Sequence, residues 1–255
     1  MKALKKTTQI LFSVAFWVGI WWLASLKMGK PLLLPTPADV IKTLFRLLGT
    51  ADFYRITTLS LCKVIVGILI AVLLGVLLSM LTSHIPFLRE LLLPLMTVIK
   101  ATPVASFIIL AWILMGASRV PSFITVLIVL PVIWTNLDMG FQRIDPQLRE
   151  VAKVYRFSLW KRLRILVMPS LKPYFVSAAR TSLGLAWKAG IAAEIITMPK
   201  DTIGTMIGEA KLYIQTSEMF AWTLVVILLS LTIEFLFAMA LKRFDKSPEE
   251  RTESI

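Results

Sequence analysis

The sequence contains very few of the residue types that build catalytic and metal centres. Its 255 residues include one cysteine, Cys62, and one histidine, His84. A single cysteine cannot form a disulfide within the chain, and one cysteine with one histidine is too small a set for a metal cluster. The acidic residues are scattered, without the paired carboxylates of a hydrolytic site. The sequence therefore predicts no catalytic residue and no metal ligand, which argues against an enzyme.

Charged residues are also scarce, at 17% of the chain, whereas 57% of the residues are hydrophobic. Soluble domains contain about 45–50% apolar residues, and the mean hydropathy here is +0.80. Because the apolar runs recur along the whole chain, we expect an all-α integral membrane protein. The net charge of +13 does not indicate nucleic-acid binding, since no basic stripe lies on a soluble domain.

Six segments meet or approach the length of about 20 apolar residues that a transmembrane helix needs. The first follows a basic N-terminus and has no small-residue cleavage site after it, so we interpret it as a retained anchor helix. The third contains Pro94 and the run from Lys100 to Pro103, and such a break must be buried in protein or line a cavity. The six segments are residues 8–26, 57–82, 92–115, 120–140, 172–198 and 218–241.

The parts outside these spans complete the organisation. The stretch PLLLPTPADVIKTLFRLLG places Val40, Ile41 and Leu44 at helical spacing, which predicts a short amphipathic helix at the membrane surface. The polar C-terminal residues are predicted to be disordered. The expected divisions are an anchor helix at 1–30, an extracytoplasmic interfacial segment at 31–56, a core at 57–242 with a long loop at 143–172, and a cytoplasmic tail at 243–255.

The basic residues predict the orientation of the chain. With the N-terminus in the cytoplasm, about twice as many Lys and Arg fall on the inner side as on the outer side, and the largest group lies in the loop at 143–172. Lys and Arg accumulate in cytoplasmic loops. We therefore expect a multi-pass protein of the cell membrane, with this loop and both termini in the cytoplasm.

The loop at 143–172 has a helical pattern of its own. Asp145 followed by Pro146 is a favourable helix start, and Ser158 is a suitable N-cap for a second helix at 159–167. Aromatic residues and arginines are favoured anchors at protein interfaces, which predicts a cytoplasmic partner. An amphipathic loop lying on anionic lipid is the alternative. The aromatic residues around the corner between the two helices are Tyr155, Phe157 and Trp160.

The segment from Glu150 to Pro169 reads EVAKVYRFSLWKRLRILVMP. It resembles the cytoplasmic "EAA" loop of ATP-binding-cassette importer permeases, whose pattern is Glu-Ala-Ala, three residues, Gly, and an apolar run ending in Leu-Pro. The Glu, the second Ala (Ala152) and the Pro match in spacing, whereas Val151 and Arg156 replace the first Ala and the Gly. Gly at such a corner permits a left-handed backbone, which a side chain disfavours. Arg156 therefore departs from the pattern at the residue that determines the shape of the corner.

The resemblance extends over about residues 30–240. It is closest to the branch that imports nitrate, sulfonates, taurine, bicarbonate and related small solutes. The stretches that carry it are LLPTPADVI, GILIAVLLGVLLSML, TSLGLAWKAGIAAEIIT and IGTMIGEA. Single residues in the third and fourth spans also agree, namely Pro94, Pro103, Gly116, Pro131, Asn136 and Gly140.

The resemblance implies a six-span permease that does not hydrolyse ATP, and the sequence indeed has no G-x-x-x-x-G-K-[ST] phosphate loop. The loop would be a coupling helix seated in a cytoplasmic ATPase subunit, and ATP and Mg would be bound there and not by this chain. The implied assembly has two ATPase subunits, a second permease copy in a homodimer, membrane lipid and an extracytoplasmic binding protein. The expected ATPase contacts are Glu150, Val151, Ala152, Tyr155, Arg156, Phe157, Ser158, Trp160 and Pro169.

Charged residues inside spans are costly and are therefore functional candidates. Arg180, Lys188 and Glu194 fall within one wedge of the fifth span at about 100° per residue. They could line a pathway, or Lys188 and Glu194 could form a structural pair. Positive charge along a pathway favours an anionic substrate, while a neutral or cationic vitamin precursor stays open. The full set of expected pathway residues is Lys100, Thr102, Pro103, Arg180, Lys188 and Glu194.

Other polar and small residues in the spans receive structural interpretations. Lys63, Asp138 and Glu234 are expected to lie toward span ends or to snorkel. Small-xxx-small spacing favours close helix contact, here between two copies of the chain. The residues with this spacing in the fifth span are Ala186, Ala189, Gly190 and Ala193, whereas Gly204 and Gly208 are expected in a short outer helix and its turn.

Two other classes of function stay open at this stage. A stand-alone secondary transporter predicts internal repeats and ion-coupling carboxylates near the membrane midplane, and no repeat is visible in the sequence. A membrane scaffold subunit would still need a cytoplasmic partner for the basic, aromatic loop.

Overall fold

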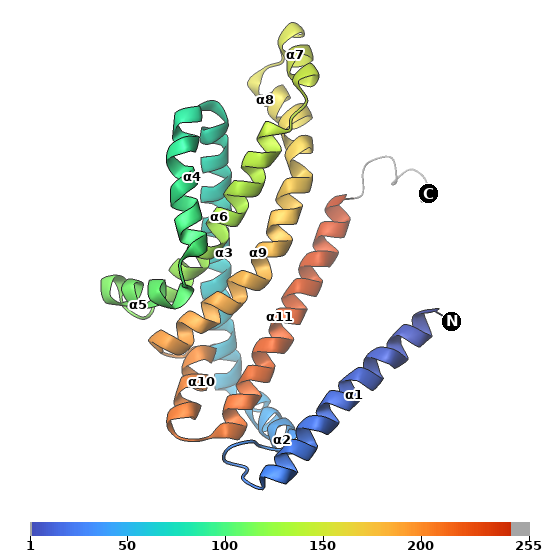
Figure 1. Ribbon diagram of the computed structural model, residues 1–255, viewed down its shortest axis with the longest axis vertical. Coiled ribbons are helices and arrows are strands. Elements are labelled where there is room, and N and C mark those ends of the chain that lie inside the picture. Colours follow the sequence, from blue (N-terminus) through green and yellow to red (C-terminus); the bar gives the residue numbers. More distant parts are fainter. Residues whose placement is uncertain (1, 246–255) are drawn as a thin grey trace.

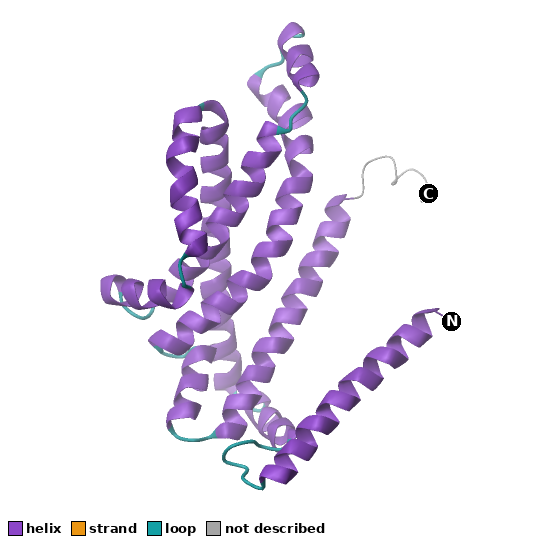
Figure 2. Ribbon diagram, in the orientation of Figure 1, coloured by secondary structure: helices purple, strands orange, loops and turns teal. Residues whose placement is uncertain are grey.

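The computed structural model describes the backbone of residues 2–245 and the side chains of residues 8–240. Within these residues the protein consists of helices and short connections, without a strand (Figure 2), and the all-α prediction is confirmed. Of the predicted tail at 243–255, residues 246–255 lie outside the described part of the chain. In chain order the elements are α1 (Lys2–Met28), α2 (Pro37–Leu48), α3 (Ala51–His84), α4 (Pro86–Ala101), α5 (Val104–Met115), α6 (Val120–Gln142), α7 (Pro146–Val154), α8 (Leu159–Arg162), the π-helix η1 (Leu163–Val167), α9 (Met168–Thr197), α10 (Ile203–Leu212) and α11 (Thr216–Asp245).

Helix α1 splays away from the bundle and meets it near its C-terminal end (Figure 1). There Trp21 stacks on Phe220 of α11, with ring centroids 5.6 Å apart, and its Nε1 donates to the Pro35 carbonyl at 3.1 Å. The predicted amphipathic helix forms as α2. Thr36 and Asp39 start it with a capping box, in which each side chain accepts from the other's backbone N–H. Local capping chemistry thus defines the beginning of this helix.

Helices α3, α6 and α9 form the centre of the bundle, and they approach one another closely because glycines lie at their contacts. A Cβ on Gly67 of α3 would lie 2.6 Å from both the Ser122 carbonyl oxygen and the Thr125 Cβ of α6. A Cβ on Gly190 of α9 would lie 2.6 Å from Val64 Cγ2 of α3. The small residues around Gly190 are buried as well, including Ala186. The small-residue stripe therefore packs inside the chain, which corrects the prediction that it lies between two copies.

The third expected span, 92–115, is two helices. Helices α4 and α5 are bent by 103° relative to each other, and α5 runs across the bundle while α4 runs beside α3 (Figure 1). The break lies at Thr102, whose backbone is extended (φ −78°, ψ 136°), because the following Pro103 disfavours a helical conformation there. Helix α4 continues through Pro94. The predicted interruption is confirmed at 100–103, and α4 and α5 together have the length and composition of one broken span.

By length and composition, four helices can cross a membrane, or five if the bent pair of α4 and α5 counts as one span. The four are α1, α3, α6 and α11. The fifth expected span, 172–198, lies within and just beyond α9, whose 30 residues extend over about 45 Å. Its length is therefore sufficient, but the charged residues Arg180, Lys188 and Glu194 lower its hydropathy.

Replacing Gly67 tests the close contact between α3 and α6. Gly67→Ala places a methyl group 2.6 Å from Ser122 and Thr125, so the helices must separate, and we expect the free energy of unfolding to fall by about 1–3 kcal/mol. The measurement is thermal unfolding of the purified full chain in detergent. Gly19→Ala in α1 is the control, because nothing lies within 4 Å of the added Cβ, and it should be neutral or stabilise by up to about 1 kcal/mol. Equal melting temperatures for the two variants would contradict this packing.

Candidate functional site

The loop between α6 and α9 projects beyond the ends of the other helices (Figure 1, at the top). It comprises α7, α8 and η1. Asp145 caps α7 by accepting from the Gln147 N–H at 2.8 Å, and Ser158 caps α8 by accepting from the Lys161 N–H at 3.4 Å. Both helix starts predicted from the sequence are confirmed.

The corner between α7 and α8 has a left-handed residue even though no glycine is present. Arg156 has φ +47°. The Phe157 N–H donates to the Ala152 carbonyl at 2.9 Å, and the Arg156 N–H donates to the Lys153 carbonyl at 3.1 Å. These are the two hydrogen bonds of a Schellman motif, in which the left-handed position usually belongs to Gly. The corner therefore keeps the geometry that glycine favours, and Arg156 is held in a conformation that costs about 1–2 kcal/mol.

The connection from α8 to α9 is continuous. A separate second helix at 159–167 was expected, but α8 passes through η1 directly into α9. A proline inside a helix clashes with the carbonyl four residues earlier. For Pro169, in the first turn of α9, that carbonyl belongs to Ile165 within η1. The π-turn changes the backbone at this carbonyl, which explains how the chain accommodates Pro169 without ending the helix.

The side chains at the corner divide into two groups. Ala152 is buried and Phe157 is half-buried, and both pack with Phe141 at the end of α6, Ile144 in the connection to α7 and Leu166 in η1. This cluster holds the loop against the bundle. The expected contacts Glu150, Val151 and Ser158 are exposed, as are Arg156 and Pro169.

Large apolar side chains of the loop point away from this cluster. The exposed fractions are 73% for Tyr155, 81% for Leu159 and 70% for Trp160. Lys161 lies over the Phe157 ring, with Nζ 4.4 Å from its centroid. The loop therefore presents an apolar and basic surface, defined here by Tyr155, Leu159, Trp160 and Lys161, that no described part of the chain covers.

The expected pathway residues occupy three different environments. At the break between α4 and α5, Lys100 donates to Thr135 Oγ1 of α6 at 2.7 Å, and Thr102 Oγ1 donates to the Val98 carbonyl. On α9, Arg180 and Lys188 are exposed. Glu194 is fully buried, and no ion pair joins it to Lys188 among the described side chains. A charge pair between Lys188 and Glu194 is therefore not formed.

Glu194 instead anchors the start of α10. Its Oε2 accepts from the Gly204 N–H at 3.1 Å and from the Ser60 hydroxyl at 2.8 Å, while Ser60 Oγ accepts from the Ile203 N–H at 2.9 Å. A carboxylate is favourable at a helix N-terminus, where backbone N–H groups lack partners. A Cβ on Gly204 would lie 2.2 Å from Glu194 Cβ, so glycine is required for this approach. The partners of Glu194 are thus Ser60 and Gly204 and not Lys188, the structural partner considered from the sequence.

Asp138 lies toward the end of α6, as expected, but it is buried there. Its Oδ2 accepts from Arg89 Nε at 2.9 Å and from Gln142 Nε2 at 2.7 Å. The sequence analysis missed this ion pair of α4 with α6. Arg89 lies near the start of α4 and Asp138 near the end of α6, at the same end of the bundle. Two opposite charges expected at the same depth are the sequence signal that could have predicted this ion pair. Lys63 is half-buried within α3 and Glu234 is exposed on α11.

The family model and the similar proteins all indicate the same family of transport permeases. The family model "Binding-protein-dependent transport system inner membrane component" matches residues 71–248. The taurine transport system permease protein TauC of Escherichia coli is 24% identical over 90% of this chain and 86% of its own length. The riboflavin transport system permease protein RibX of Chloroflexus aurantiacus is 28% identical, covering 84% and 81%. The nitrate import permease protein NrtB of Synechococcus elongatus is 26% identical, covering 76% and 73%.

A solved structure shares the fold. It is a chain of the bacterial alginate ABC transporter in complex with an alginate pentasaccharide-bound periplasmic protein, and it matches with a TM-score of 0.62. The sequence identity is 16%, and the match covers 95% of this chain and 97% of the other. The arrangement of helices is therefore shared with a chain of that transporter.

Replacing Arg156 tests the left-handed corner. Arg156→Gly removes the side chain from a residue at φ +47°, and we expect the corner to be stabilised by about 0.5–1 kcal/mol. In hydrogen–deuterium exchange of the purified chain, peptides covering 150–160 should then exchange about two- to fivefold more slowly. Lys153→Gly within α7 is the matched control and should accelerate exchange, because Gly is unfavourable in a helix interior. Faster exchange in Arg156→Gly would contradict the strain at this corner.

Proposed function

The chain belongs to the family of inner membrane components of binding-protein-dependent transport systems, and we propose that it forms the membrane pathway of an ATP-driven importer for a small anion. Members of this family are transport permeases, and the chain is a transport subunit and not an enzyme. The observation that carries the proposal is the uncovered apolar and basic surface on the projecting loop.

This surface is the proposed docking site for a separate ATPase subunit. Exposed aromatic side chains flanked by basic residues are the anchors that protein interfaces use. Tyr155 and Trp160 supply the aromatic rings, and Ala152 and Phe157 fix the loop to the ends of α6 and α9. An ATPase that binds the loop and changes shape would therefore move these two helices. In this proposal ATP and Mg are bound by two ATPase subunits, and the chain itself holds no cofactor.

The proposed orientation places the loop in the cytoplasm. The largest group of basic residues lies at this end, as expected for the inner side of a membrane protein. The opposite end, formed by α2 and α10 (Figure 1), then faces outward and receives the binding protein. A periplasmic protein is part of the related alginate transporter, which supports such a partner for this chain.

A second copy of the chain completes the proposed pathway. Arg180 and Lys188 are exposed on α9, and a charged side chain at membrane depth must face water or protein rather than lipid. A homodimer with α9 at its centre gives both residues such an environment. Together with Lys100 at the break of α4, they make the pathway positive, which favours a solute with an anionic group, such as nitrate or the sulfonate group of taurine, over riboflavin.

The loop proposal predicts a selective loss of ATPase binding. The chain is co-expressed with a candidate ATPase from the same host and purified through a tag on the chain. We expect the double variant Tyr155→Ala and Trp160→Ala to lose the ATPase, because it removes two anchors that are 73% and 70% exposed. Loss of one interface anchor typically costs about 2 kcal/mol or more, so retention should fall at least about tenfold.

Tyr213→Ala provides the matched control, because Tyr213 is 72% exposed but lies at the opposite end of the molecule, after α10. It should retain the ATPase at the wild-type level. An ATPase that stays bound to the double variant would contradict docking through Tyr155 and Trp160. An ATPase that wild type never retains in nanodiscs would favour a stand-alone transporter or a scaffold subunit.

The substrate proposal predicts that uptake depends on positive charge at Lys188. In cells that express the complete importer, radiolabelled taurine should be taken up and radiolabelled riboflavin should not. Lys188→Ala should lower taurine uptake about tenfold or more, since a hydrogen bond to a charged group contributes about 1.5–3 kcal/mol, whereas Lys188→Arg should retain much of it. Uptake of riboflavin alone, unaffected by Lys188→Ala, would contradict an anion pathway.

A further inference from the structure

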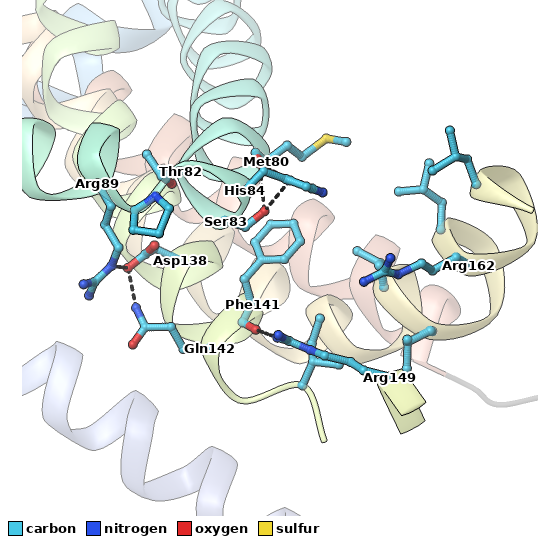
Figure 3. A pocket seen from close by; sticks show the side chains of 16 residues that line it. Met80, Thr82, Ser83, His84, Arg89, Asp138, Phe141, Gln142, Arg149 and Arg162 are labelled. Atoms are coloured by element: carbon cyan, nitrogen blue, oxygen red, sulfur yellow. Dashed lines mark hydrogen bonds and ion pairs between the residues drawn. The ribbon is translucent and has the colours of Figure 1, made fainter. Parts of the chain in front are cut away.

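A cavity of about 600 Å³ lies beneath the projecting loop. Its walls come from the ends of α3, α4 and α6 on one side and from α7, α8 and η1 on the other (Figure 3). His84 is the last residue of α3, Pro86 the first of α4 and Gln142 the last of α6. All three line the cavity, which therefore lies at the depth where the membrane helices end.

The charge of the lining is positive. Three arginines and one carboxylate contribute to it, namely Arg89, Arg149, Arg162 and Asp138. Arg89 is paired with Asp138, and Arg149 donates to the Phe141 carbonyl. The guanidinium of Arg162 has no hydrogen bond or ion pair with any described residue, and Figure 3 shows it extending from the loop side toward Phe141. One ion pair thus leaves two positive charges, and Arg162 has its donors free for a ligand.

The rest of the wall is mostly apolar. Met80 comes from α3, Phe141 from α6, and Leu163 and Leu166 from η1. A small inorganic anion makes no favourable contact with these apolar side chains. An anion attached to a hydrocarbon chain matches both the arginines and the apolar part of the wall. Basic pockets between membrane helices at the cytoplasmic surface fit the head groups of anionic lipids.

We propose that this cavity binds the phosphodiester head group of an anionic phospholipid from the cytoplasmic leaflet, with Arg162 as its principal contact. The assignment to this leaflet rests on the proposed function, which places the loop in the cytoplasm. The phosphate oxygens accept from Arg162 and from the remaining N–H groups of Arg149, and the glycerol and upper acyl region contact Met80 and Leu163. A lipid seated here bridges the α3–α4 end to α8 and η1.

The bridge has a consequence for the loop. Its position against the bundle depends on the small cluster around Ala152 and Phe157 and on Arg149, which bonds to α6. A bound head group adds a connection from α8 to the opposite wall of the cavity. Anionic lipid therefore strengthens the attachment of the loop to the helices that it is proposed to move.

Photolabelling of the full chain tests the proposal without the ATPase. The chain is reconstituted in phosphatidylcholine nanodiscs that contain phosphatidylglycerol with a diazirine in its acyl chain, and labelled peptides are mapped after illumination. We expect labelling of peptides covering 80–89 and 159–167. Arg162→Gln should reduce this labelling about tenfold, because it removes a charge-assisted hydrogen bond. Unlabelled dioleoylphosphatidylglycerol should compete, and dioleoylphosphatidylcholine should not.

Arg164→Gln is the matched control, because Arg164 is exposed two residues further along and does not line the cavity. The Arg164→Gln variant should be photolabelled to the same extent as wild type. In size-exclusion chromatography both variants should elute as single monodisperse species. Equal labelling of the two variants, labels only outside the cavity, or competition by inorganic phosphate but not by dioleoylphosphatidylglycerol would overturn the lipid site. Since both leaflets have the same composition and no ATPase is present, failure here is separate from failure of the coupling proposal.

Discussion

The closeness of α3, α6 and α9 is the constraint on which the rest of the structure depends. At Gly67, Gly75 and Gly190 an added Cβ would lie 2.6–2.7 Å from an atom of a neighbouring helix. In a membrane, helices gain little from the hydrophobic effect between them, so close van der Waals contact between small residues is what holds them together. The ends of α6 and α9 carry the projecting loop, and the C-terminal end of α9 carries α10. The geometry of both attachments therefore depends on these contacts.

The attachment of α10 shows how a charged residue can stabilise such a bundle. Glu194 is fully buried, and a buried carboxyl is tolerated only when hydrogen bonds compensate for the loss of water. The Ser60 hydroxyl of α3 and the Gly204 N–H of α10 provide them for Oε2, and Ser60 in turn accepts from the Ile203 N–H. Glu194 and Ser60 thus link three helices, and together they satisfy two backbone donors that α10 cannot satisfy itself. Gly204 is required because α10 approaches Glu194 with its first turn.

Sequence reasoning succeeded where the determining chemistry is local. The caps at Asp145 and Ser158 each act within three residues, so the pattern alone predicted them. The family resemblance supplied the importer fold and the projecting loop. Pro103 predicted the break between α4 and α5. The direction of α5 could not be predicted, because it depends on packing against α6 and α9, which are distant in the sequence.

The errors concern pairings across long sequence separations. Asp138 is bound by Arg89, 49 residues away, and Glu194 by Ser60, 134 residues away. Each charge was visible in the sequence, but its partner could be known only from the arrangement of the helices. The small-residue stripe around Gly190 was assigned to a second copy for the same reason: its spacing predicts close contact but does not say with which helix.

The corner of the loop combines strain with uncovered surface, and the two features point to the same role. Arg156 keeps a left-handed conformation that glycine would adopt without cost, and strained backbone persists only where its surroundings enforce it. Ala152 and Phe157 on one side and the hydrogen bonds of the Schellman motif on the other provide that enforcement. The corner therefore presents Tyr155 and Trp160 outward. In the proposed complex, a movement of the ATPase docked on these rings would reach the end of α6 through the contacts of Ala152 and Phe157 with Phe141.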